Sequence, residues 1–515
     1  MRNQTPRQDV GTCAASWSIR ILSLSLIGIL FLTFFPFRFS FQAIRYAGSS
    51  PFLLGGSGKD AGVYNSFLNI LLFIPFGFGL SERFRERGKS RTATLFLCLV
   101  VGALLSYTIE FLQLFIPTRD SGWEDVATNA SGSLFGCLLF VLFEVPWLRL
   151  LGRAEATVRS SLTRARAVLL ISIYFAVWLA ISISLQMETR LGDWNPESLL
   201  VVGNDAAGKF PTSWKGEVFD LEIWDHALPR KTAQALSAGG MSETSEASPQ
   251  SAYDFLAPPF EDRFRFLPPL AWTLRAMPQS GSKSIRLDGT SWLVSDAPVA
   301  NLVADIRRKN QFAIRVVCTP SEGAGSDGRI ISISRRTGPV DLQIRQDNSN
   351  LVLWFRNALS TKRALLAWYV PNIFTANQRR DILFSYDGSV VSLYIDGSRR
   401  PRQYRLGPGT GLAHLFRRVK PSELDGYNDV YYFLVFFPGG ALWGIAGQPM
   451  RIRGIAGFIF AALALSLPPV LLACALILSS GRSASLRDIA FSVILSAAGW
   501  LWINADSRTP LESRF

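Results

Sequence analysis

The sequence predicts a multi-pass α-helical membrane bundle into which an extracytoplasmic all-β jelly-roll sandwich is inserted. Long apolar runs with few charges lie at both ends of the 515-residue chain, whereas residues 188–428 have the composition of a soluble domain. From Lys283 onward, short runs rich in Ile, Val, Leu, Trp and Tyr recur between turn signals, as in a β-sandwich. The hydrophobic content of 49% and the mean hydropathy of +0.22 agree with such a mixture.

Hydropathy predicts about eight membrane spans. A helix that crosses the hydrocarbon of a bilayer needs roughly 20 mainly apolar residues. The segments that qualify are Ile21–Phe37, Val63–Leu80, Ala93–Pro117, Val126–Phe143, Ala167–Met187, Val430–Gly447, Gly454–Leu478 and Ile489–Ile503. The first is not followed by a small-residue cleavage site, so we expect an uncleaved anchor.

These spans divide the chain into four parts. They are a cytoplasmic N-terminus (1–19), a membrane domain of five helices (20–187), the sandwich (188–428) with a Ser/Gly/Pro-rich linker near 237–259, and about three C-terminal helices (429–515).

Basic residues in short loops predict the orientation, because such loops stay preferentially in the cytoplasm. Arg and Lys cluster at 83–91 and at 149–166, two spans apart, so both loops should lie inside and the sandwich outside the cytoplasm. The formal charge of +14 is distributed over such loops rather than along one basic stripe, which argues against nucleic acid as a partner. The five cysteines show neither a disulfide framework nor a zinc-site spacing.

Polar side chains within the second, third and fourth spans gather near the outer face of the predicted bundle. Together with Arg119 of the connecting loop, they are Asn69, Tyr107, Glu110, Gln113, Asp125 and Asn129. Because isolated charges in a membrane are costly, we expect Glu110, Arg119 and Asp125 to form one hydrogen-bonded cluster.

This cluster has two interpretations. Its residues can simply join three helices, or they can form a site in which Arg119 holds an anionic group such as a lipid phosphate and Glu110 or Asp125 moves a proton. The sequence shows no nucleophile or metal-ligand cluster beside them.

One string of residues resembles the signature of the VanZ-like family. It consists of Glu110-x-x-Gln113, followed by Pro117, Arg119, Asp125, Asn129, Gly132 and Gly136, and the preceding segment 69–77 fits as well. The resemblance covers roughly residues 20–145. It implies a protein of the bacterial cytoplasmic membrane with a function in the cell envelope, and the family is associated with resistance to the glycopeptide antibiotic teicoplanin. It also implies close packing of the fourth helix at its two glycines.

The middle region resembles LamG or concanavalin A-like lectin and glucanase domains. Its predicted strands are Phe312–Cys318, Arg329–Ser334, Asp341–Arg345, Leu351–Phe355, Asp381–Tyr386 and Ser389–Ile395, and Asp-Gly pairs provide tight turns. The segment Asp381–Gly397 resembles the hairpin of these domains, and Ser284–Leu293 resembles an opening strand. Gly216–Ala235 resembles the closing segment but comes first here. We therefore expect either a permuted sandwich or a strand pair that joins from the N-terminal side.

This second resemblance implies binding of an extracytoplasmic glycan or envelope protein. Trp354, Trp368 and Tyr369 are candidate glycan contacts, although aromatic strand residues generally fill sandwich interiors. No paired acidic motif of a glucanase is found, and no cofactor is expected. Whether the sandwich binds calcium stays open. The acidic residues beside glycines, Asp288, Asp387 and Asp396, are more typical of turns than of calcium ligands, and we expect His226 to lie in an exposed turn.

A short pattern recurs near the C-terminus. Residues 436–440 repeat the Phe, Pro and Gly spacing of residues 73–77. Because no second Glu-x-x-Gln follows, we do not expect a complete second VanZ-like half, and we attribute the pattern to aromatic and proline residues at the membrane interface.

Taken together, these patterns favour an envelope protein in which a VanZ-like bundle anchors a binding module, rather than an enzyme. The main alternative is a membrane enzyme that uses Glu110, Arg119 and Asp125 at the outer face on a lipid-linked cell-wall or polysaccharide precursor. A transporter is less favoured, because the cytoplasmic halves of the spans show no second charged layer.

Overall fold

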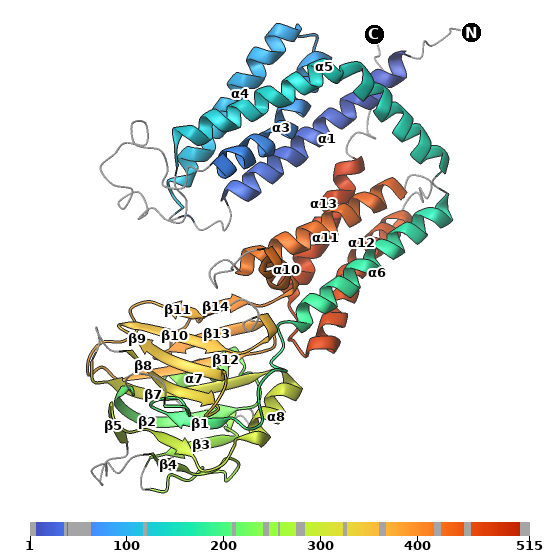
Figure 1. The fold of residues 1–515 in the computed structure, drawn as a ribbon. Helices are drawn as coiled ribbons and strands as arrows, with labels where there is room; N and C mark the ends of the chain where they lie inside the picture. The colour runs from blue at the N-terminus through green and yellow to red at the C-terminus, as the bar shows by residue number, and fades with distance from the viewer. Residues whose placement is uncertain are drawn as a thin grey trace. The chain divides into compact units, whose positions relative to one another are not determined.

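The computed structural model describes residues 7–34, 39, 63–116, 121–161, 163–208, 213–239, 247–255, 258–273, 284–322, 327–359, 367–416, 424–446 and 455–504. The chain forms two compact units (Figure 1), and each is described by itself. The first contains residues 1–170, 444–451 and 500–515, and the second contains residues 171–443 and 452–499.

Four helices make up most of the first unit: α1 (Arg7–Phe34), α3 (Val63–Glu86), α4 (Arg91–Gln113) and α5 (Trp123–Ser161). Apolar side chains such as Phe73 and Cys137 fill the space between them. As predicted, α5 packs closely at its glycines, because a Cβ added to Gly132 or Gly136 would overlap backbone carbonyls of α3. The backbone of α5 leaves helical geometry at Phe143, where the predicted fourth span ends.

The helices of the second unit are α6 (Arg164–Met187), α10 (Pro408–Phe416), α11 (Leu424–Ala446), α12 (Ile455–Ser480) and α13 (Leu486–Asn504). The boundary between the units falls within α6, at residue 170 rather than at residue 187. The reason is packing, since the rings of Phe175 and Trp178 lie against Phe436 and Tyr431 of α11, with centroids 6.3 and 5.8 Å apart.

Among the residues that the structure describes, seven helices are long and apolar enough to cross a membrane: α1, α3, α4, α5, α6, α12 and α13. The sixth predicted span, Val430–Gly447, coincides with α11, a helix of 23 residues with Asp425 in its first turn, which is not among the seven. The helix α12 continues through Pro468 and Pro469.

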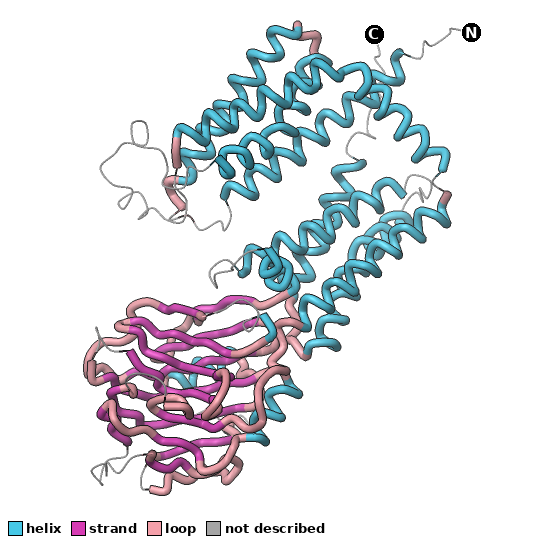
Figure 2. Tube along the Cα trace, viewed as in Figure 1, coloured by secondary structure: helices cyan, strands magenta, loops and turns pink. Residues whose placement is uncertain are grey.

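Two antiparallel sheets form the sandwich (Figure 2). One has the order β11-β10-β9-β8-β1-β6-β4, and the other has the order β14-β13-β12-β7-β2-β3 with β5 also paired to β2. The strands are β1 (Leu199–Val202), β2 (Lys215–Trp224), β3 (Ser251–Asp254), β4 (Leu270–Trp272), β5 (Ile285–Asp288), β6 (Leu293–Ser295), β7 (Phe312–Pro320), β8 (Asp327–Ser334), β9 (Val340–Asp347), β10 (Asn350–Phe355), β11 (Trp368–Val370), β12 (Arg380–Tyr386), β13 (Val390–Ile395) and β14 (Arg402–Arg405). All six predicted strands are present, and β12 and β13 form the predicted hairpin.

The N-terminal strands of the sandwich lie in the middle of its two sheets. The strand β1 pairs with β8 and β6, and β2 pairs with β7, β3 and β5. Each of these N-terminal strands is thus an interior strand of one sheet, which both expected arrangements allow. The predicted linker near 237–259 is partly wrong, because residues 251–254 form β3. Two short helices, α7 (Arg230–Ser237) and α8 (Ala300–Lys309), complete the domain.

Candidate functional site

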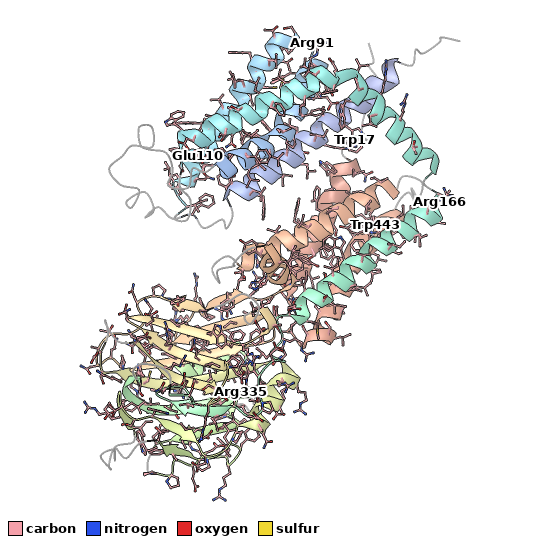
Figure 3. The ribbon with its side chains drawn as sticks, viewed as in Figure 1. Trp17, Arg91, Glu110, Arg166, Arg335 and Trp443 are labelled. Atoms are coloured by element: carbon pink, nitrogen blue, oxygen red, sulfur yellow. The ribbon has the colours of Figure 1, made fainter. Side chains whose placement is uncertain are left out.

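Six of the polar residues predicted from the sequence are described, and they lie toward one end of the first bundle. Asn69 is on α3, Glu110 and Gln113 are on the last turns of α4, and Asp125 is on the first turn of α5. Figure 3 shows Glu110 and Arg91 at opposite ends of α4. The residues meet because α4 and α5 are joined by a short connection, so that the end of one helix lies beside the beginning of the next.

Two acidic side chains form the centre of this polar cluster. Asn69 Nδ2 donates to Asp125 Oδ1 over 2.6 Å, which joins α3 to α5. Glu110 is only 2% exposed, and its Oε2 accepts the backbone N–H of Gly122 over 3.1 Å. Ser121 Oγ donates to the backbone carbonyl of Glu110 over 2.8 Å. The segment that leads into α5 is therefore bound to the end of α4, and the helix dipole of α5 favours a carboxylate at Asp125.

A second layer of amides joins the same helices. Asn129 Nδ2 donates to Ser106 Oγ over 2.9 Å, and both residues are buried. Gln113 Nε2 donates to the carbonyl of Thr33 on α1 over 3.0 Å. Ser106 was not among the predicted residues, although it lies four residues before Glu110 and therefore on the same helical face.

The two remaining predicted members differ in what the structure describes. The ring of Tyr107 packs against Trp123, with centroids 6.1 Å apart. Arg119 lies outside the described residues, so the expected cluster of Glu110, Arg119 and Asp125 stays a prediction.

The candidate glycan contacts of the sandwich differ in exposure. Trp354 is 9% exposed, and Trp368 packs against Tyr404 with ring centroids 4.9 Å apart. Tyr369 is 57% exposed on β11, which ends its sheet. The register places Tyr369 opposite Val352, so its ring is on the outer face of the sheet. Of the three, Tyr369 is the ring available to a ligand.

Of the acidic residues beside glycines, Asp288 and Asp387 cap their own turns, whereas Asp396 binds the start of β12. Asp288 Oδ1 accepts the N–H of Thr290 over 2.8 Å, Asp387 Oδ1 accepts that of Ser389 over 3.0 Å, and Asp396 Oδ1 accepts that of Asp381 over 2.9 Å. His226 is half-buried with its Nδ1 3.0 Å from Asp225 Oδ1. Within the described residues, no three His, Cys, Asp or Glu side chains are arranged to hold a metal ion.

A half-buried charge cluster lies on the sheet that contains β2, β7 and β12. Arg315 contacts Asp381 at 2.7 Å, Glu222 at 2.8 Å and Asp220 at 3.5 Å. Burial raises the pKa of Asp220 to about 6, the charge of Glu222 adds to this, and Arg315 opposes it. One guanidinium thus neutralises three carboxylates incompletely.

The sandwich is fixed to the helices of its own unit by a network around Asp488, the first-turn acid of α13. Asp488 accepts from Arg405 of β14 at 3.1 Å, from Arg482 at 2.9 Å and from Tyr432 of α11 at 3.2 Å. Arg405 Nε also donates to Asp425 over 3.0 Å. We name this group of five residues the seat.

Further hydrogen bonds surround the seat. Ser483 binds Asp387 through both its backbone N–H, at 3.1 Å, and its Oγ, at 2.6 Å. Asn310 Nδ2 donates to the carbonyl of Ser480 over 2.8 Å. The seat could not be predicted from the sequence, because its members come from three separate stretches of the chain: β14, α11 and residues 482–488.

Comparison with known proteins concerns the first bundle. Residues 22–144 match the VanZ/LLP1 family model. Over 127 residues, the chain is 26% identical to Protein VanZ of Enterococcus faecium, and the alignment covers 24% of this chain and 72% of that protein. No solved structure matches the chain. The family match begins in α1, ends at the kink of α5 and contains every member of the polar cluster.

Proposed function

We propose, from the premise that residues 22–144 form a VanZ/LLP1 domain, that this chain is a bacterial envelope protein whose sandwich binds a glycan or an envelope protein outside the cytoplasm. The seat is the observation that carries the proposal. A domain fixed by Arg405 to both Asp425 and Asp488 is held in one orientation on its helices, as a presented binding module requires.

The charges of the first bundle support the orientation. The basic segment 83–91 joins α3 to α4 and lies at the opposite end of α4 from Glu110. Since basic loops stay in the cytoplasm, the polar cluster faces the outside of the cytoplasmic membrane. A contribution to the glycopeptide-antibiotic response follows from the resemblance to VanZ.

The outer face of β11 is the proposed contact surface, because Tyr369 exposes its ring there. An aromatic ring offers a sugar a large apolar face with little loss of conformational entropy. The test uses the full chain in lipid nanodiscs on an array of bacterial envelope glycans and purified envelope proteins, with and without calcium.

We expect saturable binding to one ligand class. Tyr369→Ala should weaken it roughly tenfold, which corresponds to about 1.4 kcal/mol. Phe264→Ala is the matched control, because Phe264 is 48% exposed elsewhere on the sandwich. If the folded protein binds none of these ligands, the proposal is wrong.

A second candidate is a membrane enzyme that acts on a lipid-linked cell-wall or polysaccharide precursor. Its supporting observation is Glu110, a carboxylate buried beside the Asn69–Asp125 pair at the end of the bundle. Buried ionisable groups in membrane helices are frequently functional, and a carboxylate in such a position can transfer a proton. Arg119 would hold the anionic group of the substrate.

Glu110→Gln and Arg119→Ala separate the two candidates. For a pure anchor, teicoplanin sensitivity and ligand binding by the sandwich stay unchanged in cells that carry either variant at normal protein levels. A changed sensitivity with intact ligand binding would instead favour the enzyme.

A further inference from the structure

Two helices of the first unit, α3 and α5, repeat in α11 and α13 of the second at a constant offset of 363 residues, so that Tyr64 corresponds to Tyr427. Between α3 and α11, this offset aligns identical residues at six positions: Tyr64, Asn65, Leu71, Phe73, Pro75 and Gly77 with Tyr427, Asn428, Leu434, Phe436, Pro438 and Gly440. Between α5 and α13, the same offset aligns Asp125, Ala127, Ser133 and Gly136 with Asp488, Ala490, Ser496 and Gly499. No insertion or deletion is needed across the two intervening loops and α4.

The closest backbone approaches recur at the same offset. A Cβ added to Gly77 would overlap the carbonyl oxygen of Ser133, and one added to Gly440 would overlap that of Ser496. The pairs Gly136 with Ile74 and Gly499 with Phe437 repeat this relation. Each unit thus packs its second helix against its fourth at corresponding positions.

A polar contact recurs as well. Asn69 donates to Asp125 over 2.6 Å in the first unit, and Tyr432 donates to Asp488 over 3.2 Å in the second. Both donors and both acceptors are 363 residues apart. Sequence, packing and hydrogen bonding therefore agree on one register.

We propose that the membrane part of this chain is a tandem duplication of one four-helix unit. The second copy has lost the counterpart of Glu110, has kept that of Asp125, and holds the sandwich through the seat. The first copy consists of α1, α3, α4 and α5, and the second of α6, α11, α12 and α13. The sandwich is inserted between the first two helices of the second copy. This proposal departs from the expectation that no complete second VanZ-like half exists.

The second copy lacks the side chains that a proton transfer would need. The counterparts of Glu110 and Gln113 are Ala473 and Leu476, and Leu476 is 2% exposed in the apolar core around Tyr431. No carboxylate on α12 can therefore move a proton beside Asp488.

The acid that the second copy retains is fully engaged. Asp488 accepts from two arginines and one tyrosine, and Arg482 is only 6% exposed. The cavity beside Arg482 and Asp488 measures about 20 Å³, which holds about one water molecule. A phosphate or sugar does not fit there.

The sandwich covers this position directly. The turn at Asp387 and Gly388 lies on Arg482 and Ser483, and a Cβ added to Gly388 would come within 2.8 Å of Arg482 Cα. Corresponding helix ends thus have different roles: the first copy uses them for the polar cluster, and the second uses them to hold a domain.

The corresponding acids give a matched pair of variants, Asp125→Asn and Asp488→Asn, made in the full chain in nanodiscs. The reporter is Ser480→Cys in a background without the natural cysteines, because Ser480 is fully buried at the seat. Asp488→Asn should increase the rate of thiol labelling at least tenfold, and Asp125→Asn should leave it unchanged. Ser483→Ala, which removes one hydrogen bond to Asp387, should give a smaller increase.

Equal labelling in the Asp488→Asn and Asp125→Asn proteins would overturn the assignment of the seat. If Asp488→Asn does not fold, an unchanged labelling rate in Ser483→Ala would overturn it instead. Neither result depends on ligand binding, so a failure of the seat assignment can be distinguished from a failure of the proposed glycan- or protein-binding function.

Membrane sidedness tests the duplication itself. Cysteines at Thr92 and at its counterpart Ile455 should react with a membrane-impermeant thiol reagent from one side. Those at Ser121 and its counterpart Ala484 should react from the other. This pattern requires α11 to cross the membrane in addition to the other seven helices, because it is the counterpart of α3. Opposite sides for Thr92 and Ile455 would overturn the duplication.

Discussion

Replacing Asp220 by asparagine should stabilise the sandwich at neutral pH. Arg315 lies 2.7 Å from Asp381 but 3.5 Å from Asp220, so Asp220 is the least compensated acid of the half-buried charge cluster. Its pKa is raised to about 6, first by burial and then by the charge of Glu222. An amide of the same shape keeps the packing and removes the charge.

The sign of the expected stability change follows from proton binding. An aspartate in an unfolded chain titrates near pH ~4. The folded sandwich therefore binds more protons than the unfolded chain between about pH 4 and pH 6, and Asp220 lowers its stability as the pH rises through this interval. A difference of about two pKa units corresponds to at most ~3 kcal/mol. Since the side chain is 31% exposed, solvent screening reduces the expected gain for Asp220→Asn to ~1–2 kcal/mol at pH 7.

The assay is urea-dependent thiol labelling of Cys318 in the full chain. Cys318 is fully buried in β7, and the other four cysteines are replaced. The variant should unfold at higher urea concentration at pH 7, and the difference should vanish near pH 4. Glu322→Gln is the control, because Glu322 is 51% exposed beside Lys215 and should change stability by only a few tenths of a kcal/mol. A gain of equal size at both pH values, or no gain, would refute the electrostatic argument.

Three further substitutions test other contacts. Gly440→Ala should destabilise the second unit by ~1–3 kcal/mol through overlap with α13, as measured by thermal unfolding in detergent, whereas Gly28→Ala, which meets open space, should have no effect. Asn310→Ala should lower the urea midpoint of Cys318 labelling by the equivalent of ~2 kcal/mol, because it leaves two buried backbone groups unpaired, and an unchanged midpoint would contradict this. Asn129→Ala should lower the free energy of unfolding of the first unit by ~1–2 kcal/mol, because it removes the hydrogen-bond donor to Ser106. Ser106→Ala, which removes the acceptor of the same bond, should lower it by no more.

Local patterns made much of the fold predictable. The six predicted strands appear because alternating side chains and Asp-Gly turns act within a few residues of each other, as in the hairpin of β12 and β13. The spans follow from apolar runs that are equally local. The strand β3 was missed because a Ser- and Gly-rich composition resembles a linker, and its pairing with β2 depends on residues far away in the sequence.

The sites were predictable only where one motif contains the chemistry. Glu110 and Asn69 belong to such a motif, and the structure places both in the polar cluster. The seat joins Arg405 to Asp488 across 83 residues, and nothing near either residue indicates the other. The second copy was not predicted because the expectation rested on a second Glu-x-x-Gln. The proposed duplication keeps the glycine contacts but has alanine in place of Glu110.

The central positions of β1 and β2 have a consequence during protein synthesis. Both strands leave the ribosome before β7 and β8, their partners in the middle of the two sheets. From Leu199 to Ser334 the ribosome must add well over a hundred residues, which takes on the order of ten seconds at typical elongation rates. During that time β1 can pair only with β6, and β2 only with β3 and β5, so one edge of each nascent sheet stays unpaired until β7 and β8 emerge.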